Sequence, residues 1–304
     1  MRESAQPFPP PDGHVRATLV PGGTVSSASG RPRGAGTWGN TFMQHRTTVA
    51  GLAGALVLSA LAIPGTAQAD DASGDIRITK VVVNGGKDIA LGTTDVKTFT
   101  IAVTATDDSG ILTGNTFPIL WHTPLPNGDY YGLVIPTDIA GTCVRQSVTT
   151  TTCTHTLKIN PRVHPQDNTT AGTWTVRTHV QANDGDYLTK NSAGEAKVLR
   201  NSRLTVNASP EPVKKNGTIT VTGALTRANW STYKYAGYTK QPVKLQFRKK
   251  GTSTYKTLKT VTTDSKGQLK TTTKATTDGY FRYSFAGTST TPAVTTAGDY
   301  VDVK

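Results

Sequence analysis

The chain has 304 residues, of which 33 are Lys or Arg and 20 are Asp or Glu, giving a formal net charge of +13. This length predicts one to three domains. Two cysteines exclude a disulfide-dense scaffold and a four-cysteine zinc site, and 30 glycines with 17 prolines exclude a protein of long helices. A hydrophobic fraction of 35% is compatible with Thr-rich β-structure.

The N-terminal region predicts processing. Residues 1–42 mix Pro, Gly and small polar residues without apolar periodicity, which predicts a disordered segment and indicates that Met43 is the true start. A short basic region, an apolar stretch from Val49 to Ile63 and an Ala67-Gln68-Ala69 motif follow. This order is typical of a secretory signal peptide over residues 43–69, and the apolar stretch is too short to span a bilayer. We therefore expect an extracellular mature protein that begins at Asp70.

Residues 70–203 contain short alternating stretches separated by Gly, Asn, Asp and Pro, which predicts an immunoglobulin-like all-β sandwich. Trp174, Val176 and Val180 share one parity and should face its core. The strand candidates in chain order are 76–78, 81–83, 99–103, 116–121, 131–135, 154–159, 174–180 and 196–199.

Cys143 and Cys153 flank a Thr-rich turn between two of these strand candidates. Outside the cell we expect them to be oxidised. Their separation suits a hairpin disulfide worth about 2–4 kcal/mol, whereas a redox-active pair would more typically be C-x-x-C. The sequence therefore predicts a structural disulfide.

Acidic residues lie in two Gly-containing loops, Asp107 and Asp108 in one, and Asp184 and Asp186 in the other. Ca²⁺ prefers six to eight oxygen ligands, so the four carboxylates would share an ion if the loops met at one end of the sandwich. Neither loop matches the twelve-residue Ca²⁺-binding pattern, and Asp-Gly and Asn-Asp-Gly are ordinary turn sequences. The sequence favours the turn interpretation, so we expect no cofactor and leave Ca²⁺ as the alternative.

Residues 204–304 predict a second immunoglobulin-like sandwich, because about seven strand candidates fit about 100 residues. The alternation is clearest at 243–248 and 281–285. No Cys…Trp…Cys pattern is present, which excludes an antibody-type domain. The join near Arg200–Arg203 lacks a Gly/Pro-rich linker, so we expect little freedom between the two domains.

Charge divides at this join. Residues 70–203 carry 12 basic and 13 acidic side chains, a net charge of −1, and residues 204–304 carry 16 basic and 5 acidic, a net charge of +11. One interpretation is solubility and protection of strand edges by Lys. The other is adhesion to a polyanion such as teichoic acid, an acidic glycan or extracellular DNA.

A segment rich in rings and cations, together with two turn lysines, is the candidate ligand-binding site of the second domain. Exposed rings beside cations suit stacking on sugars, peptides or nucleotides. The alternative is that Trp230 and one or two tyrosines cap the open end of the sandwich. The candidate residues are Trp230, Tyr233, Lys234, Tyr235, Tyr238, Lys240, Lys249 and Lys250.

No active site is predicted. The histidines after Asp70 lie in separate segments without metal-binding spacing, and G-x-S-x-G is absent. His155 shares the parity of Leu157 and should be partly buried. These histidines are His122, His155, His164 and His179.

Several stretches resemble secreted actinobacterial (Streptomyces-type) proteins with tandem immunoglobulin-like β-sandwiches. In the second domain these are 204–213, 219–223, 242–248, 278–287 and 299–303; in the first they are 83–88 and 182–187. The resemblance implies a tandem β-sandwich and secretion. Such proteins are of unknown function and some carry a calcium-binding label.

Together these features predict a secreted, non-enzymatic binding or adhesion protein. It would associate with anionic cell-envelope or matrix polymers through the basic second domain. The expected partner is an anionic cell-wall polymer, a glycan or a protein, with nucleic acid not expected as the specific ligand. The alternative is a structural or calcium-stabilised extracellular module without a dedicated ligand.

Overall fold

A computed structural model describes residues 69–122, 132–165 and 167–304. These residues fall within one compact unit, Ile63–Lys304, and form strands joined by turns and two short 3₁₀ segments, η1 (Asn84–Gly86) and η2 (Asn168–Thr170). The predicted disordered segment 1–42 and the cleavage region of the predicted signal peptide, except Ala69, lie outside the described residues. Across the described ranges, no helix is long and apolar enough to cross a membrane.

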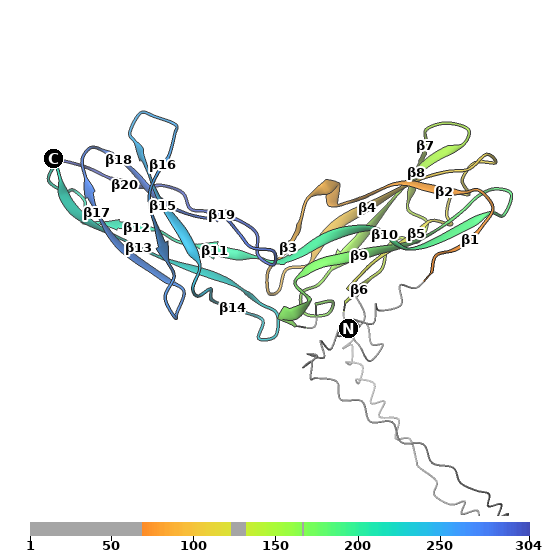
Figure 1. The fold of residues 1–304 in the computed structure, drawn as a ribbon, viewed down its shortest axis with the longest axis horizontal. Coiled ribbons are helices and arrows are strands. Elements are labelled where there is room, and N and C mark those ends of the chain that lie inside the picture. The colour runs from red at the N-terminus through yellow and green to blue at the C-terminus, as the bar shows by residue number, and fades with distance from the viewer. Residues whose placement is uncertain (1–68, 123–131, 166) are drawn as a thin grey trace, which may run out of the picture. The chain divides into compact units, whose positions relative to one another are not determined.

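The first sandwich consists of two sheets around one buried core (Figure 1). One sheet has the strand order β2 (Arg77–Val83), β4 (Lys97–Thr106), β8 (Thr150–Ile159), β7 (Thr142–Arg145). The other has the order β1 (Asp71–Ser73), β10 (Tyr187–Arg200), β9 (Gly172–Gln181), β5 (Phe117–Trp121), β6 (Leu133–Val134), and β3 (Ile89–Leu91) pairs parallel with the end of β10. Lettered A to G along the chain, the sheets are ABED and CFG with β6 as C′, which is the immunoglobulin arrangement.

Alternating apolar side chains create this core. Phe99 and Ile101 of β4 are buried, and so is Trp174 of β9, as their parity predicts. The Trp174 indole N–H donates to the carbonyl oxygen of Thr170 at 2.8 Å, which satisfies its polar atom. Gly132 has a φ of +79°, and a Cβ there would lie 2.2 Å from the Trp174 ring, so only glycine fits.

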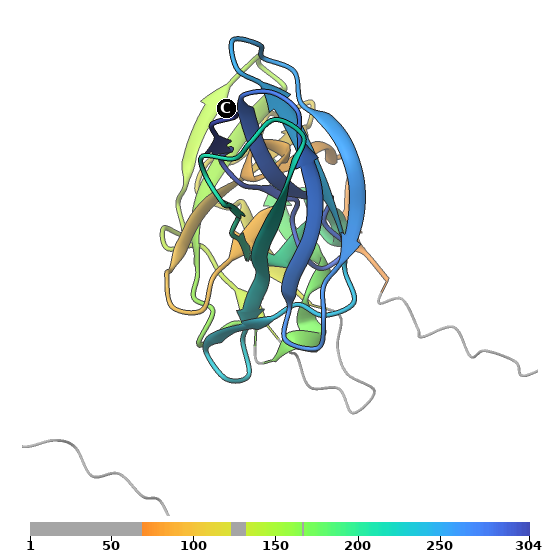
Figure 2. The same ribbon diagram turned by 90° about the vertical axis from the view of Figure 1, so that its left-hand side faces the viewer.

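The second sandwich is also built of two sheets around its own buried core (Figures 1 and 2, teal to blue strands). In the first sheet, β13 (Gly217–Asn229) pairs with β11 (Ser202–Leu204), β12 (Asn207–Ser209), β14 (Lys234–Gly237) and β17 (Gln268–Ala275). In the second sheet, β16 (Lys256–Thr262), β15 (Pro242–Lys249) and β18 (Gly279–Phe285) lie in that order, followed by β19 (Val294–Thr295) and β20 (Asp299–Val301). The lettered sheets are ABE and C′CFG, a related immunoglobulin-like arrangement. The predicted fold class, two tandem immunoglobulin-like sandwiches, is confirmed.

The second core follows the predicted alternation. Phe281, Tyr283 and Phe285 point inward and are buried. The Tyr283 hydroxyl donates to the carbonyl oxygen of Val221 at 3.0 Å, and burial raises the pKa of Tyr283 to about 12. Each large apolar side chain buried in this way contributes about 1.5–3 kcal/mol relative to exposure.

Residues 200–204 join the two sandwiches without a loop, since β10 ends at Arg200 and β11 begins at Ser202. Arg200 is buried, its amide donates to the carbonyl oxygen of Thr290, and its Nε donates to that of Ala228. Burial, and then the charge of Arg227, lowers the pKa of Arg200 to about 10.

Candidate functional site

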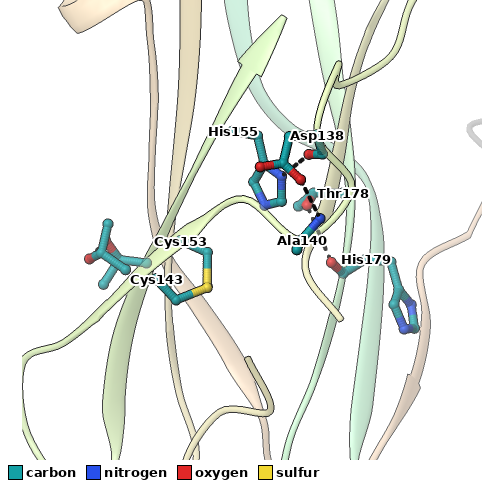
Figure 3. The surroundings of a disulfide bond; sticks show 9 residues. Asp138, Ala140, Cys143, Cys153, His155, Thr178 and His179 are labelled. Carbon is teal, nitrogen blue, oxygen red and sulfur yellow. Dashed lines mark hydrogen bonds between the residues drawn. A yellow bond between two sulfur atoms is a disulfide. The ribbon is translucent and has the colours of Figure 1, made fainter. Parts of the chain in front are cut away.

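The predicted disulfide is confirmed. Cys143 and Cys153 occupy opposite positions of β7 and β8 and are bonded across the hairpin (Figure 3). His155, two residues further along β8, is fully buried, and its Nδ1 lies 3.4 Å from the carbonyl oxygen of Asp138. Burial lowers the pKa of His155, so the neutral ring is the form that the fold favours.

The segment rich in rings and cations, residues 230–240, contains the turn between β13 and β14, the strand β14 and the start of the next connection, and is not one long loop. Strand β13 runs to Asn229 and pairs back with β14, so Trp230 begins the turn between them. Trp230 is fully buried, within the core cluster of the first sandwich, and its indole N–H donates to the carbonyl oxygen of Gly92 at 3.0 Å. This corrects the expectation of an exposed ring, because Trp230 fills a core and offers no face to a ligand.

The tyrosines of the same segment differ in exposure. The guanidinium of Arg203 lies 3.7 Å above the Tyr235 ring, and that of Arg227 lies 3.8 Å above Tyr238, which is only 9% exposed. Tyr233 is 41% exposed. The candidate side chains of this segment that reach solvent are Tyr233, Lys234 and Lys240.

The turn lysines lie apart from this segment. Lys240 precedes the start of β15 and Lys249 ends it; an eight-residue strand at about 3.3 Å per residue places them about 25 Å apart. The Lys250 Nζ donates to the Tyr300 hydroxyl at 3.1 Å and lies 3.5 Å from an Asp278 oxygen. The bond to Tyr300, and then the charge of Asp278, raises the pKa of Lys250. The eight predicted residues therefore do not form one patch.

A cationic surface that the sequence pattern does not reveal follows strands β16 and β17. Among the described strands β16 pairs only with β15, and β17 only with β13, so both are edge strands. The two edges meet, because the Lys259 Nζ donates to the carbonyl oxygen of Thr272 at 2.8 Å. Between 256 and 274 the only acidic residue is Asp264. We call the exposed cations of this segment the lysine edge: Lys256, Lys259, Lys266, Lys270 and Lys274.

The outer face of β15 and β18 carries a stacked array of cations and rings. The Arg248 guanidinium lies 4.2 Å above Tyr280, and that of Arg282 lies 3.6 Å above Tyr255. The rings of Tyr280 and Tyr300 are 5.2 Å apart. Because the protein's own cations stack on these rings, the stacking stabilises the sheet face, and the covered ring faces are not open to a ligand.

The acidic loops do meet. The β9–β10 turn packs on the loop after β4, because the amide of Asn183 donates to the Gly110 carbonyl oxygen at 3.0 Å. One carboxylate oxygen from each of Asp107, Asp108 and Asp184 lies within 4.8 Å of the others. Of these three side chains Asp107 is buried, while the other two are exposed.

A further acid, Asp75, joins this group from the segment before β2. Ligand atoms of Asp75, Asp107 and Asp186 also lie within 4.8 Å of one another. The amide of Asp75 donates to Asp186 Oδ2 at 2.9 Å, and a Cβ on Gly74 would overlap that carboxylate, so glycine is required before Asp75. We call the whole group the acidic cluster: Asp75, Asp107, Asp108, Asp184 and Asp186.

No protein-family model matches the chain, and no curated protein matches it significantly. Among solved structures it is similar to a marsupial T cell receptor, at 13% identity over 73% of this chain and 72% of the other, with a TM-score of 0.35. It is also similar to the D00-D0 domain of intimin, at 14% identity over 73% and 99%, with a TM-score of 0.25. Dpr2 Ig1-Ig2 in complex with DIP-Theta Ig1-Ig3 matches at 12% identity over 75% and 65%, with a TM-score of 0.24. The immunoglobulin-like assignment rests on the strand order and pairing given above.

Proposed function

We propose that this protein is a secreted, non-enzymatic adhesion module that attaches to anionic polymers of the cell envelope or extracellular matrix through the lysine edge. The observation that carries the proposal is the concentration of five exposed lysines on two neighbouring edge strands and the turn between them, with a single acidic residue among them. The predicted signal peptide and the Cys143–Cys153 disulfide support an extracellular location.

The spacing of the lysines suits an extended polyanion. Lys270 and Lys274 lie on the same face of β17, about 13 Å apart at the usual strand rise. Lys256 and Lys259 lie on β16, and the Lys259 Nζ reaches the carbonyl oxygen of Thr272 on β17. Cations in a row displace counterions from a charged polymer wherever it lies along them, so binding requires no pocket and no single ring.

A second function fits the same residues. Lysines on edge strands prevent the addition of a foreign strand, and both β16 and β17 are edges. The two functions predict different consequences of charge removal. Loss of edge protection would cause self-association at micromolar concentration, whereas loss of an adhesion surface would leave a monodisperse protein that no longer binds polymer.

The experiment compares two sets of five substitutions in the full chain. The first replaces the lysine edge by Gln. The control replaces five exposed lysines of the first sandwich by Gln and changes net charge equally: Lys80, Lys87, Lys97, Lys158 and Lys197.

Binding to immobilised teichoic acid and to a sulfated glycan is measured at low salt, with light scattering on the same samples. The proposal predicts that the lysine-edge variant loses binding at least about tenfold more than the control does. Equal losses in both variants would show that net charge alone decides retention and would contradict it. Aggregation of the lysine-edge variant without loss of binding would favour edge protection.

A further inference from the structure

The acidic cluster has no counter-charge among the described residues. The two ion pairs found in those ranges, Lys250–Asp278 and Lys304–Asp302, belong to the second sandwich. Arg145 lies near the cluster but donates to the carbonyl oxygens of Ser147 and Val148 at 3.0 and 2.7 Å. Five carboxylates from three segments are thus held together without a protein cation.

Asp107 supplies a second, independent observation. Its side chain is only 4% exposed. Oδ1 accepts hydrogen bonds from the Ser109 amide at 2.8 Å and the Ser109 hydroxyl at 2.6 Å, whereas Oδ2 is buried and accepts none from any described residue. A buried carboxylate oxygen without a partner is costly, and Asp107 is the member shared by both carboxylate trios.

The spacing of the oxygens matches a hard cation. Two ligands that are each about 2.4 Å from one ion are at most about 4.8 Å apart, and the carboxylate oxygens of each trio lie within that limit. All ligands are carboxylates, with no thiolate or imidazole to favour zinc or copper. Mg²⁺ demands near-ideal octahedral geometry, while Ca²⁺ accepts six to eight oxygens in irregular arrangements, as three separate segments would supply.

We propose that the acidic cluster is a Ca²⁺ site in which Asp107 is the shared ligand, and that the ion fastens the segment before β2 to the two loops. Asp75 is the ligand through which the ion would hold this segment, since it is the one member of the acidic cluster that comes from it. The site lies in the first sandwich and does not depend on the proposed adhesion by the lysine edge.

The test is thermal melting and calorimetric titration of the purified full chain after treatment with chelator. Calcium at a hundredfold excess over its Kd should raise the Tm by about 5–10 °C, since only the folded state binds it. Mg²⁺ at the same concentration should give a smaller shift. Superimposable melts with and without Ca²⁺ and no heat of binding would overturn the proposal, and so would an equal shift with Mg²⁺.

Two matched variants separate ligation from folding. Asp107→Asn keeps the Oδ1 acceptor for Ser109, so it should lose the Ca²⁺ shift while its Tm in chelator stays equal or rises. Asp167→Asn is the control, because Asp167 makes the same kind of turn as Asp107 but lies in neither trio. Its carboxylate accepts hydrogen bonds from the Thr169 amide and hydroxyl at 2.7 and 2.6 Å. It should keep the full shift.

A Ca²⁺ shift that survives in Asp107→Asn, or one that both variants lose, would contradict the site. Asp75→Asn is a second probe at an exposed position, in case Asp107→Asn fails to fold. It should weaken Ca²⁺ binding at least about tenfold, as expected for the loss of one charged ligand. Unchanged affinity in Asp75→Asn would contradict the fastening of the N-terminal segment.

Discussion

The two sandwiches share a fold but use charge in opposite ways. The first is nearly neutral and gathers five carboxylates at one place, where three chain segments meet. The second carries a net charge of +11 and spreads its lysines over edge strands and turns, with only two acids paired to lysines among the described residues. A concentrated charge suits one small ion, and a distributed charge suits an extended polymer. We therefore expect the same architecture to bind two kinds of ligand, one at its loops and one at its strand edges.

The largest expected effect is a loss of stability on replacing Trp230, which connects the two sandwiches. Trp230 belongs to the second sandwich in sequence but is buried with the core residues of the first. Trp230→Ala should lower the free energy of unfolding by about 3–5 kcal/mol, as expected for a large buried ring, and leave polymer binding unchanged. Denaturant unfolding would measure the loss, with Tyr233→Ala, an exposed neighbour, as the control. If the Trp230→Ala protein kept its stability but bound polymer more weakly, the prediction would be contradicted, and Trp230 would contact the ligand.

Removal of the disulfide should be the next largest effect. Replacing Cys143 and Cys153 by Ser removes the cross-link that closes a loop of sequence separation 10 in the unfolded chain. On the loop-entropy model this should lower the free energy of unfolding by about 2–3 kcal/mol. The loss should appear in the unfolding of the first sandwich only. Urea unfolding, followed separately for the two sandwiches by hydrogen exchange, would test this. A loss shared equally by both would mean that they unfold as one cooperative unit.

A pH titration should distinguish the sandwiches, because residues 204–304 contain no histidine. Burial lowers the pKa of both His155 and His164 from the ordinary value of 6.5. Stability of the first sandwich should therefore be full above pH 6.5 and fall as the pH drops from 6.5 toward the lower folded values, since the unfolded chain then binds more protons. Urea unfolding at pH 7.5 and 5.5 would measure it. His155→Gln should make the stability of the first sandwich depend less on pH. An unchanged dependence in that variant would mean that other groups cause it.

The smallest effect is expected at Asp75. Partial desolvation, and then the charges of Asp108, Asp107 and Asp186, raise the pKa of Asp75. Above that raised pKa the ionised carboxylate disfavours the native state, so in chelator at pH 7 Asp75→Asn should give a small rise in Tm. The rise should vanish near pH 3, where the unfolded carboxyl is also protonated. A fall in Tm at pH 7 would show that the charge of Asp75 stabilises the ion-free fold.

Sequence patterns predicted strands whose inward face is apolar, such as β4, β9 and β18, because one buried face leaves a period of two. They missed β16 and β17, where Lys and Thr occupy most positions and interrupt the apolar alternation, although Leu269 is buried in the core and Val261 packs against it. Strand pairing, and not apolar pattern, defines such edges. The disulfide was predictable from its spacing and from the extracellular location that the signal-peptide pattern predicts.

Sites depended on contacts that are distant in sequence. Asp75 meets Asp186 because β1 pairs with the start of β10, and it meets Asp107 because β2 pairs with the end of β4, and the order of residues does not reveal these pairings. The burial of Trp230 likewise depends on its packing among residues of the first sandwich. The four carboxylates named from the sequence do converge, whereas the ring of Trp230 is buried, since exposure is decided by the tertiary fold.

The most direct measurement of the central claim is the salt dependence of binding to an anionic polymer by the wild type, the lysine-edge variant and the first-sandwich control. Counterion release makes the logarithm of affinity fall linearly with the logarithm of salt concentration, with a slope set by the number of contacting cations. The account predicts that the lysine-edge variant loses about three to five units of this slope while the control loses less than about one. Equal slopes in all three proteins, or binding that does not depend on salt, would contradict it.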